Sequence, residues 1–429
     1  MTKRRQRLIA RLWLHLLIVV IGLLLLFFSN PNRLAHDQIY HRLFRLIHHD
    51  PRLFADDYLF GSPKRILMDS YFSYEALGAI ADRVGSEEVV RWLLVPVAFI
   101  IFTAGFFELN YAASRRLAIS FALALAANWH IPNVFTAEWG LPGPSELDPW
   151  VFFQAATPTL VLGVYAGIQR QRWWILALAF AVAGGLGNFH IISAFYFVGI
   201  AAMTYCIIRG WGVRTVAFCA AAGGLAGLAS LPFLLTHYAP AIVHDTAFNS
   251  GDGEIRAAID AAAYHVTLPG RLVNAKPWLV VHGYTIWPLA ALFLWGYWRQ
   301  SRQQGQPPPP FLRFARDWIA ATIIFNIGFS LVQIFRLVGL GQLPFWNEPR
   351  GFQLVYFGLI PSAAIIIGAG LQRAGERVSV KTLAAATAVL ALVAAVAVGA
   401  RLPWLRQRYR EHITPRYSYA TCDAKLYRF

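Results

Sequence analysis

The stretch LLIVVIGLLLLFFS, residues 16–29, is an unbroken run of apolar residues that ends in a single serine. Together with residues 11–15 it is long enough to cross the hydrocarbon core of a bilayer. Because lipid tails cannot satisfy backbone N–H and C=O groups, the segment must be helical. The basic start MTKRRQR is typical of a signal peptide, but no small-residue cleavage site follows the apolar run. We therefore expect an uncleaved first transmembrane helix with a cytoplasmic N-terminus.

The composition extends this expectation to the whole chain. Of its 429 residues, 57% are hydrophobic and only 14% are charged, against roughly 25% charged residues in soluble domains. This pattern predicts an all-α polytopic membrane protein, with residues 1–429 forming a single integral membrane domain of about eleven transmembrane helices. The expected spans are 11–29, 89–108, 117–129, 151–168, 173–187, 190–208, 213–235, 278–297, 313–336, 352–371 and 382–400.

The charges are sorted along the chain. Seventeen of the 22 acidic residues lie in four loops, 30–88, 130–150, 236–277 and 337–350, whereas lysine and arginine gather in the short loops between them. Positive residues collect on the cytoplasmic side of membrane proteins, so the four acidic loops are expected outside and the protein in the cell inner membrane. This also explains the net charge of +16 better than nucleic-acid binding does.

Three outer segments carry further expectations. The loop 30–88 is far longer than an ordinary helix connection, and its segments 37–49 and 74–85 have the apolar spacing of amphipathic helices on the outer surface. The loop 236–277 has the composition of a flap with an embedded helix. The side of the membrane on which the C-terminal tail 401–429 lies is left open. An odd number of spans puts the tail outside, whereas its basic charge favours the inside.

The first outer loop contains adjacent carboxylates. Asp56 and Asp57 lie in HHDPRLFADDYLF, residues 48–60, shortly after the first apolar segment. Neighbouring carboxylates can bind a hard divalent cation, or one of them can act as a general base. An acidic pair that only caps a loop is the simpler alternative. The length of the loop favours a functional role, and Asp57 is then the predicted ligand of any divalent cation.

Polar residues in later loops are candidate binding groups. Glu138 lies in an acidic, tryptophan-rich loop that could contact sugar hydroxyls, although an interfacial aromatic belt explains the tryptophans. His190 follows GGLGNF in a turn between two spans, where a histidine more often caps a helix. Arg350 and Gln353, in NEPRGFQL at residues 347–354, are expected at the outer mouth of a span. An arginine fork there suits phosphate or carboxylate oxygens, with snorkelling toward headgroups as the alternative.

Several other chemistries have no support in the sequence. No HEXXH, Walker A, GxSxG or dinucleotide-binding motif is present. The three cysteines form no CxxC pair, so no disulfide framework or zinc motif is expected.

The acidic pair in FADDYLF, the helices and outward histidine of residues 145–197, and the arginine of NEPRGFQL resemble the GT-C superfamily of membrane glycosyltransferases. The resemblance implies transfer of a sugar from a polyprenyl-phosphate carrier to an acceptor on the outer face. Asp56 or Asp57 would take the acceptor proton or hold a cation that does so, and Arg350 would meet the carrier phosphate. Glu138, His190 and Gln353 would contact substrate, and membrane lipids would surround the helices.

Two other classes remain open. A transporter or flippase carries polar groups at the membrane midplane, where this chain offers only Gln154, Asn326 and Gln333. A non-catalytic membrane component of polysaccharide assembly would lack a cavity that joins Asp57 to Arg350.

Overall fold

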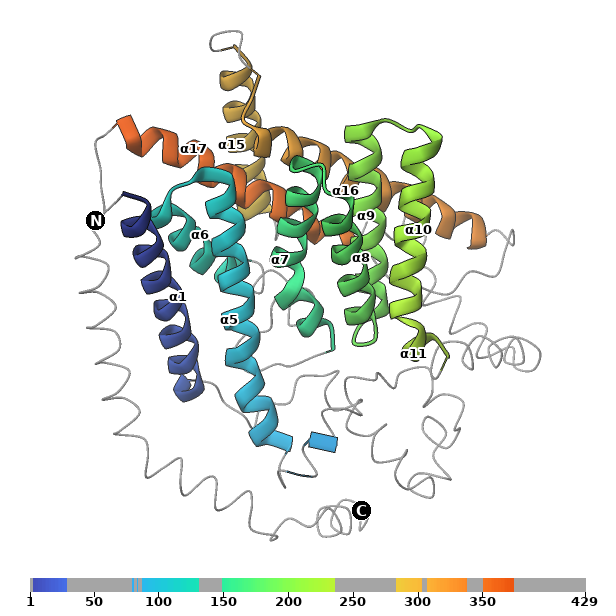
Figure 1. Cartoon of the computed structure of the whole chain (residues 1–429), viewed down its shortest axis with the longest axis horizontal. Coiled ribbons are helices and arrows are strands. Elements are labelled where there is room, and N and C mark those ends of the chain that lie inside the picture. Colours follow the sequence, from blue (N-terminus) through green and yellow to red (C-terminus); the bar gives the residue numbers. More distant parts are fainter. Residues whose placement is uncertain are drawn as a thin grey trace.

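The computed structural model of the chain describes residues 3–28, 79–80, 83, 87–130, 149–235, 283–302, 307–337 and 350–373. Every regular element in these ranges is a helix (Figure 1). The helices are α1 (Lys3–Phe28), α5 (Glu87–Ser114), α6 (Leu117–His130), α7 (Pro149–Gln169), α8 (Trp173–Gly187), α9 (Ile191–Arg209), α10 (Val213–Ala229), α11 (Leu231–Phe233), α15 (Gly283–Arg302), α16 (Pro310–Leu337), the 3-10 helix η2 (Arg350–Val355) and α17 (Tyr356–Arg373).

The helices agree with the predicted membrane organisation in its main features. Each predicted span from 11–29 to 352–371 falls on a helix of the bundle, whereas the span 382–400 lies outside the described residues. By length and composition, five segments of these helices could cross a membrane: Arg5–Leu24, Pro96–Ser114, Val151–Gln169, Ile191–Arg209 and Gly351–Gly370. The chain is therefore a multi-pass helical membrane protein. The flap 236–277, the tail 401–429 and the amphipathic segment 37–49 lie outside the described residues, and of 74–85 only residues 79, 80 and 83 are described, all helical.

Three differences from the predicted helix bounds concern α10, η2 and α5. The predicted span 213–235 ends as a regular helix at Ala229, because Pro232 follows and cannot continue the backbone hydrogen bonding. The predicted span 352–371 begins as the tighter helix η2 before α17. The helix α5 continues past Glu108 to Ser114, although Glu108 was expected at a helix end, because partners on α1 neutralise its carboxylate.

Arginines gather at one end of the bundle. The turns at 115–116, 170–172 and 210–212, the start of α1 and the end of α15 all lie at this end, which is uppermost in Figure 1. The arginines in or beside these turns and at the end of α15 are Arg115, Arg116, Arg170, Arg172, Arg209, Arg214, Arg299 and Arg302. We call this the basic end. Such clustering follows the rule that predicted the orientation, and the side of the membrane that it faces stays a prediction.

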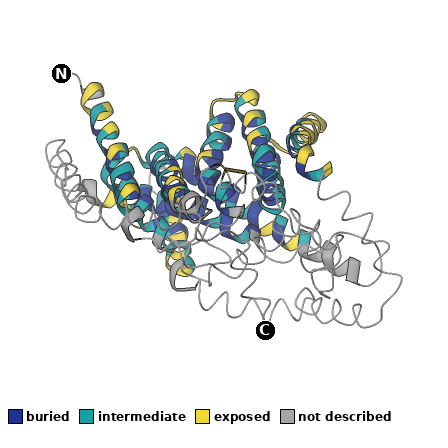
Figure 2. Cartoon of the chain, turned by 90° about the horizontal axis from the view of Figure 1, so that it is seen from below, coloured by how far each residue is buried: buried dark blue, intermediate teal, exposed yellow. Residues whose placement is uncertain are grey.

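The outer surface of the bundle is apolar. Large apolar side chains project outward from α1, α8 and α16, whereas buried residues line the faces that the helices turn toward one another (Figure 2). The exposed set includes Leu8, Leu12, Leu16, Leu23, Trp174, Leu178, Val182, Ile323, Ile324 and Ile327. An apolar surface of this extent fits contact with lipid rather than with water.

The core is centred on α5, which packs against α1, α6, α7 and α17. Phe102, Phe106 and Phe107 on α5 are fully buried. The ring of Phe106 stacks on Phe357 of α17 with centroids 5.0 Å apart. Aromatic packing of this kind joins the first helices of the chain to one of the last.

The motif GGLGN, at residues 184–188, joins α8 to α10. A Cβ atom on Gly184 would lie only 2.1 Å from the carbonyl oxygen of Ala226, so only glycine permits this helix crossing. The amide of Asn188 donates to the carbonyls of Gly185 and Ala229 at 2.8 and 2.9 Å. Its oxygen accepts from the Phe233 N–H at 3.0 Å. The motif that suggested a functional turn therefore closes the packing between helices.

This crossing gives a stability prediction with a matched control. Gly184→Ala should lower the free energy of unfolding by about 1–3 kcal/mol, because the new methyl group must displace the α10 backbone. Gly185→Ala should be neutral or slightly stabilising, because no heavy atom lies within 4 Å of that Cβ position. Unfolding of the two variants in detergent micelles measures the difference. Equal effects of the two substitutions would contradict the close contact between Gly184 and the backbone of α10.

Candidate functional site

The structure describes three of the predicted site residues at least in part. His190 and Gln353 are described with their side chains, and Arg350 is described as the first residue of η2. Asp56, Asp57 and Glu138 lie outside the described residues. Whether Asp56, Asp57, Glu138, His190 and Arg350 converge on one outward cavity therefore stays open, and the site is built around η2.

The helix η2 lies inside the bundle, where it packs against α9, α16 and α17. Gly351 has no room for a side chain, because a Cβ atom there would lie 2.5 Å from both the Asn326 Oδ1 and the Tyr196 Cδ1. Tyr196 belongs to the second turn of α9 and Asn326 lies past the middle of α16. The backbone beside Arg350 therefore packs into the bundle at Gly351, where the candidate span Gly351–Gly370 begins. The place of Arg350 at the outer mouth of a span stays a prediction.

Gln353 links η2 to α7. Its Oε1 accepts a hydrogen bond from the Nε2 of Gln154 at 3.0 Å. Gln353 is only 4% exposed, so its amide cannot easily exchange this bond for one to water, whereas Gln154 is half-buried. At the next residue of η2, the Leu354 carbonyl accepts a hydrogen bond from the indole Nε1 of Trp318 on α16 at 2.7 Å. Together these bonds attach both sides of η2 to the bundle.

Asn326 supplies a buried polar atom beside Gly351. Its Nδ2 donates to the Thr322 carbonyl at 2.7 Å, one helical turn earlier. Its Oδ1 is buried and accepts no hydrogen bond from the described residues. A buried oxygen without a donor costs free energy, about 1–3 kcal/mol, and such atoms are common where a ligand or water binds. We define the η2 junction as Gln154, Tyr196, Asn326, Gly351 and Gln353.

His190 has the capping role that was the alternative to binding. It is the N-cap of α9, and its Nδ1 accepts from the Ser193 N–H at 3.2 Å. The Ser193 hydroxyl lies 2.8 Å from the same nitrogen. Since an amide N–H can only donate, Nδ1 carries no proton and the ring is neutral. His190 is 2% exposed, so contact with a substrate needs a route that this geometry does not supply.

The sequence identified part of this arrangement. Gln154 and Asn326 stood out as polar residues within predicted spans, and Gln353 as a neighbour of Arg350. Tyr196 and Trp318 were missed, because aromatic residues are ordinary in membrane helices. Only their contacts with the η2 backbone distinguish them.

A metal ion has no support from the described side chains. Within the described ranges, no group of three or more histidine, cysteine, aspartate or glutamate residues could hold a metal ion. Asp57, the predicted ligand of a divalent cation, lies outside those ranges. The cation therefore stays a prediction tied to the first outer loop.

Comparison of the chain with protein-family models, curated proteins and solved structures finds no match.

The glutamine pair predicts a strong energetic coupling. Gln154→Leu should lower the free energy of unfolding by about 1–3 kcal/mol, because it leaves the buried Gln353 amide without its partner. Gln353→Leu should cost less, because the Gln154 amide that it leaves is only half-buried. The double variant should cost less than the sum of the two, since both amides are then removed. Unfolding in micelles measures all three variants.

The control pairs Gln154→Leu with Gly370→Ala near the far end of α17, where no heavy atom lies within 4 Å of the Cβ position. The effects of these two substitutions should simply add. Additive effects of the two glutamine substitutions would show that the hydrogen bond between them contributes nothing.

Proposed function

We propose that this protein transfers a sugar from a polyprenyl-phosphate donor to an acceptor at the outer face of the cell inner membrane. In this proposal the chain has eleven spans, its basic end faces the cytoplasm, and the η2 junction belongs to the donor site. Asp56 and Asp57 provide the base, or hold a divalent cation that acts in its place. Arg350 binds the phosphate.

The observation that supports the proposal best is the position of Arg350 at the start of η2. An isoprenoid carrier has an apolar tail and a phosphate head, so its site needs apolar surface and a cation close together. The backbone at Arg350 adjoins Gly351, which packs against α9 and α16. The exposed apolar side chains of α16, among them Ile323, Ile324 and Ile327, offer surface for the tail.

The chemistry follows from the charges involved. The acceptor hydroxyl loses its proton to an aspartate as its oxygen attacks the anomeric carbon. The bond between that carbon and the phosphate oxygen breaks, and the electron pair leaves with the phosphate. The guanidinium of Arg350 stabilises the negative charge that develops there. A positioned general base contributes about 10²–10⁴-fold to such a rate.

The proposal predicts distinct effects of two substitutions. Asp57→Asn should slow transfer about 10²–10⁴-fold, because the amide cannot accept the proton. Arg350→Gln should lower kcat/KM for the donor about 10–100-fold, with a fall in kcat as well as a rise in KM, because the guanidinium both binds the phosphate and stabilises its developing charge. A charge-assisted hydrogen bond of this kind is worth about 1.5–3 kcal/mol. The assay uses purified protein, radiolabelled polyprenyl-phosphate sugars and envelope extract as acceptor, and it follows release of the polyprenyl phosphate.

Asp69→Asn is the matched control, because it removes a carboxylate from the same loop but not from the adjacent pair. Unchanged rates for folded Asp57→Asn and Asp56→Asn would remove both aspartates from the reaction. Absence of transfer by the unmodified protein with every donor would contradict the proposed function itself.

A second candidate is a flippase for the same class of lipid-linked sugar. It is favoured by the buried Asn326 Oδ1 beside η2, the 3-10 helix that leads directly into α17, because transporters bind polar substrates inside the bundle beside backbone that departs from the α-helix. Reconstituted vesicles distinguish the two functions. A flippase moves an intact lipid-linked sugar between leaflets, whereas a transferase changes its mass. A non-catalytic component of polysaccharide assembly does neither.

A further inference from the structure

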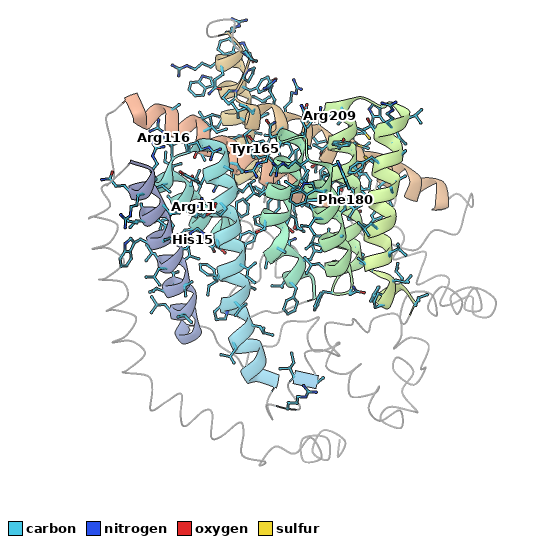
Figure 3. The ribbon with its side chains drawn as sticks, viewed as in Figure 1. Arg11, His15, Arg116, Tyr165, Phe180 and Arg209 are labelled. Atoms are coloured by element: carbon cyan, nitrogen blue, oxygen red, sulfur yellow. The ribbon has the colours of Figure 1, made fainter. Side chains whose placement is uncertain are left out.

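A cluster of ionisable side chains joins α1 to α5 near the basic end. The two oxygens of Glu108 on α5 accept from the guanidinium of Arg11 on α1, with Nε 2.6 Å from Oε1 and Nη2 in contact with Oε2. The Nε2 of His15, one turn further along α1, lies 3.1 Å from Oε1 of the same carboxylate. Figure 3 labels Arg11 and His15 on the face of α1 toward α5.

These three residues lie within segments that could cross a membrane, Arg5–Leu24 and Pro96–Ser114. Ionisable residues are expensive in lipid, are rarely present without a function, and are paired with one another. The proposed transfer reaction assigns no role to these three residues. A separate role for Arg11, His15 and Glu108 is therefore expected.

The hydrogen-bond geometry fixes the protonation of His15. Its Nδ1 lies 2.9 Å from the backbone carbonyl of Arg11, and a carbonyl can only accept, so Nδ1 carries a hydrogen. Both oxygens of Glu108 accept from Arg11, so the carboxylate is ionised. The Nε2 that faces this carboxylate must then donate as well. A ring that donates from both nitrogens is an imidazolium cation.

Among the described residues, Glu108 is the one anion that faces His15. Besides Arg11, the charged or titratable groups on the nearby parts of the packed elements are Tyr111 on α5 and the cations Arg5, Arg7, Arg115 and Arg116. The guanidinium carbons of Arg11 and Arg115 lie 5.3 and 6.0 Å from the Tyr111 ring centroid. Every neighbouring cation opposes a positive charge on His15. The imidazole ring of His15 also packs edge-on against Phe107, with ring centroids 5.1 Å apart.

We propose that His15 and Glu108 form a proton-binding site inside the membrane-spanning bundle, and that the bound proton fastens α1 to α5. Release breaks the Nε2–H bond, leaves its electron pair on Nε2 and passes the proton to water or hydroxide. The bare nitrogen then faces a carboxylate oxygen, and the two lone pairs repel. Raising the pH should therefore loosen α1.

The direct test is nitrogen NMR of the His15 ring. Residues Leu14 and His15 form the only Leu–His dipeptide in the chain. Leucine labelled with ¹³C at the carbonyl and histidine labelled with ¹⁵N therefore identify His15 without any substitution. At pH 7 both ring nitrogens should give protonated signals, whereas His190, identified by the unique Phe189–His190 pair, should show one bare nitrogen. A neutral His15 ring at pH 7 would overturn the proposal.

Two variants test the cause and the consequence. In Glu108→Gln at the same pH, His15 should show a neutral ring, because the one anion that holds the proton is gone. In the unmodified protein the thermal midpoint should fall from pH 6.5 to pH 9, because the native state holds a proton that the unfolded chain has released. His15→Gln should remove that part of the fall. Equal pH dependence of the two proteins, or an unchanged cation in Glu108→Gln, would contradict the site.

Discussion

Within a bilayer, a polar group must find its partner in the protein, because lipid tails neither donate nor accept hydrogen bonds. This constraint explains the backbone, which is helical in every regular element of the described ranges. It also explains the polar side chains, which lie where helices meet. Gln154 pairs with Gln353, and Ser230 donates to the Gly184 carbonyl at 2.7 Å. Such bonds specify which helix faces meet in a bundle whose apolar surfaces alone would pack in many ways.

The polar groups separate into two regions with different chemistry. The η2 junction holds neutral amides, a 3-10 helix and one buried oxygen without a described donor. The α1–α5 cluster holds three ionisable groups near the basic end. The sequence offers few polar residues within the predicted spans, which favoured a transferase that acts at the outer face over a transporter. Glu108, inside α5 and not at its end, weakens that argument and makes the flippase a stronger competitor.

The sequence predicted the helices well, because the length of an apolar run is a local property. It placed ten helices to within about eight residues at each end. It carried the span 213–235 past Pro232, although proline cannot continue the backbone hydrogen bonding and α10 ends at Ala229. It could not predict that Glu108 lies inside a helix, because its partner Arg11 is 97 residues away. The roles of Gly184 and Gly351 depend in the same way on the backbone or side chains of distant helices.

The candidate site was predicted in part for similar reasons. His190 was singled out as a candidate substrate contact, with helix capping as the alternative. The hydrogen bond from the Ser193 N–H shows the cap, and contact with a substrate stays a prediction. Gln353 was singled out as a neighbour of Arg350, but its pairing with Gln154 follows only from the fold. Asp56, Asp57 and Glu138 lie beyond the described helices, and their convergence with Arg350 stays a hypothesis.

The central claim is that the basic end and the acidic loops lie on opposite sides of the membrane. Single cysteines at Gln171, in a turn of the basic end, and at Tyr58, beside the acidic pair, test it directly after Cys206, Cys219 and Cys422 are replaced by serine. A membrane-impermeant maleimide added outside intact cells should label position 58, and should label position 171 only after permeabilisation. Labelling of position 171 from outside, or of both positions from the same side, would contradict this arrangement.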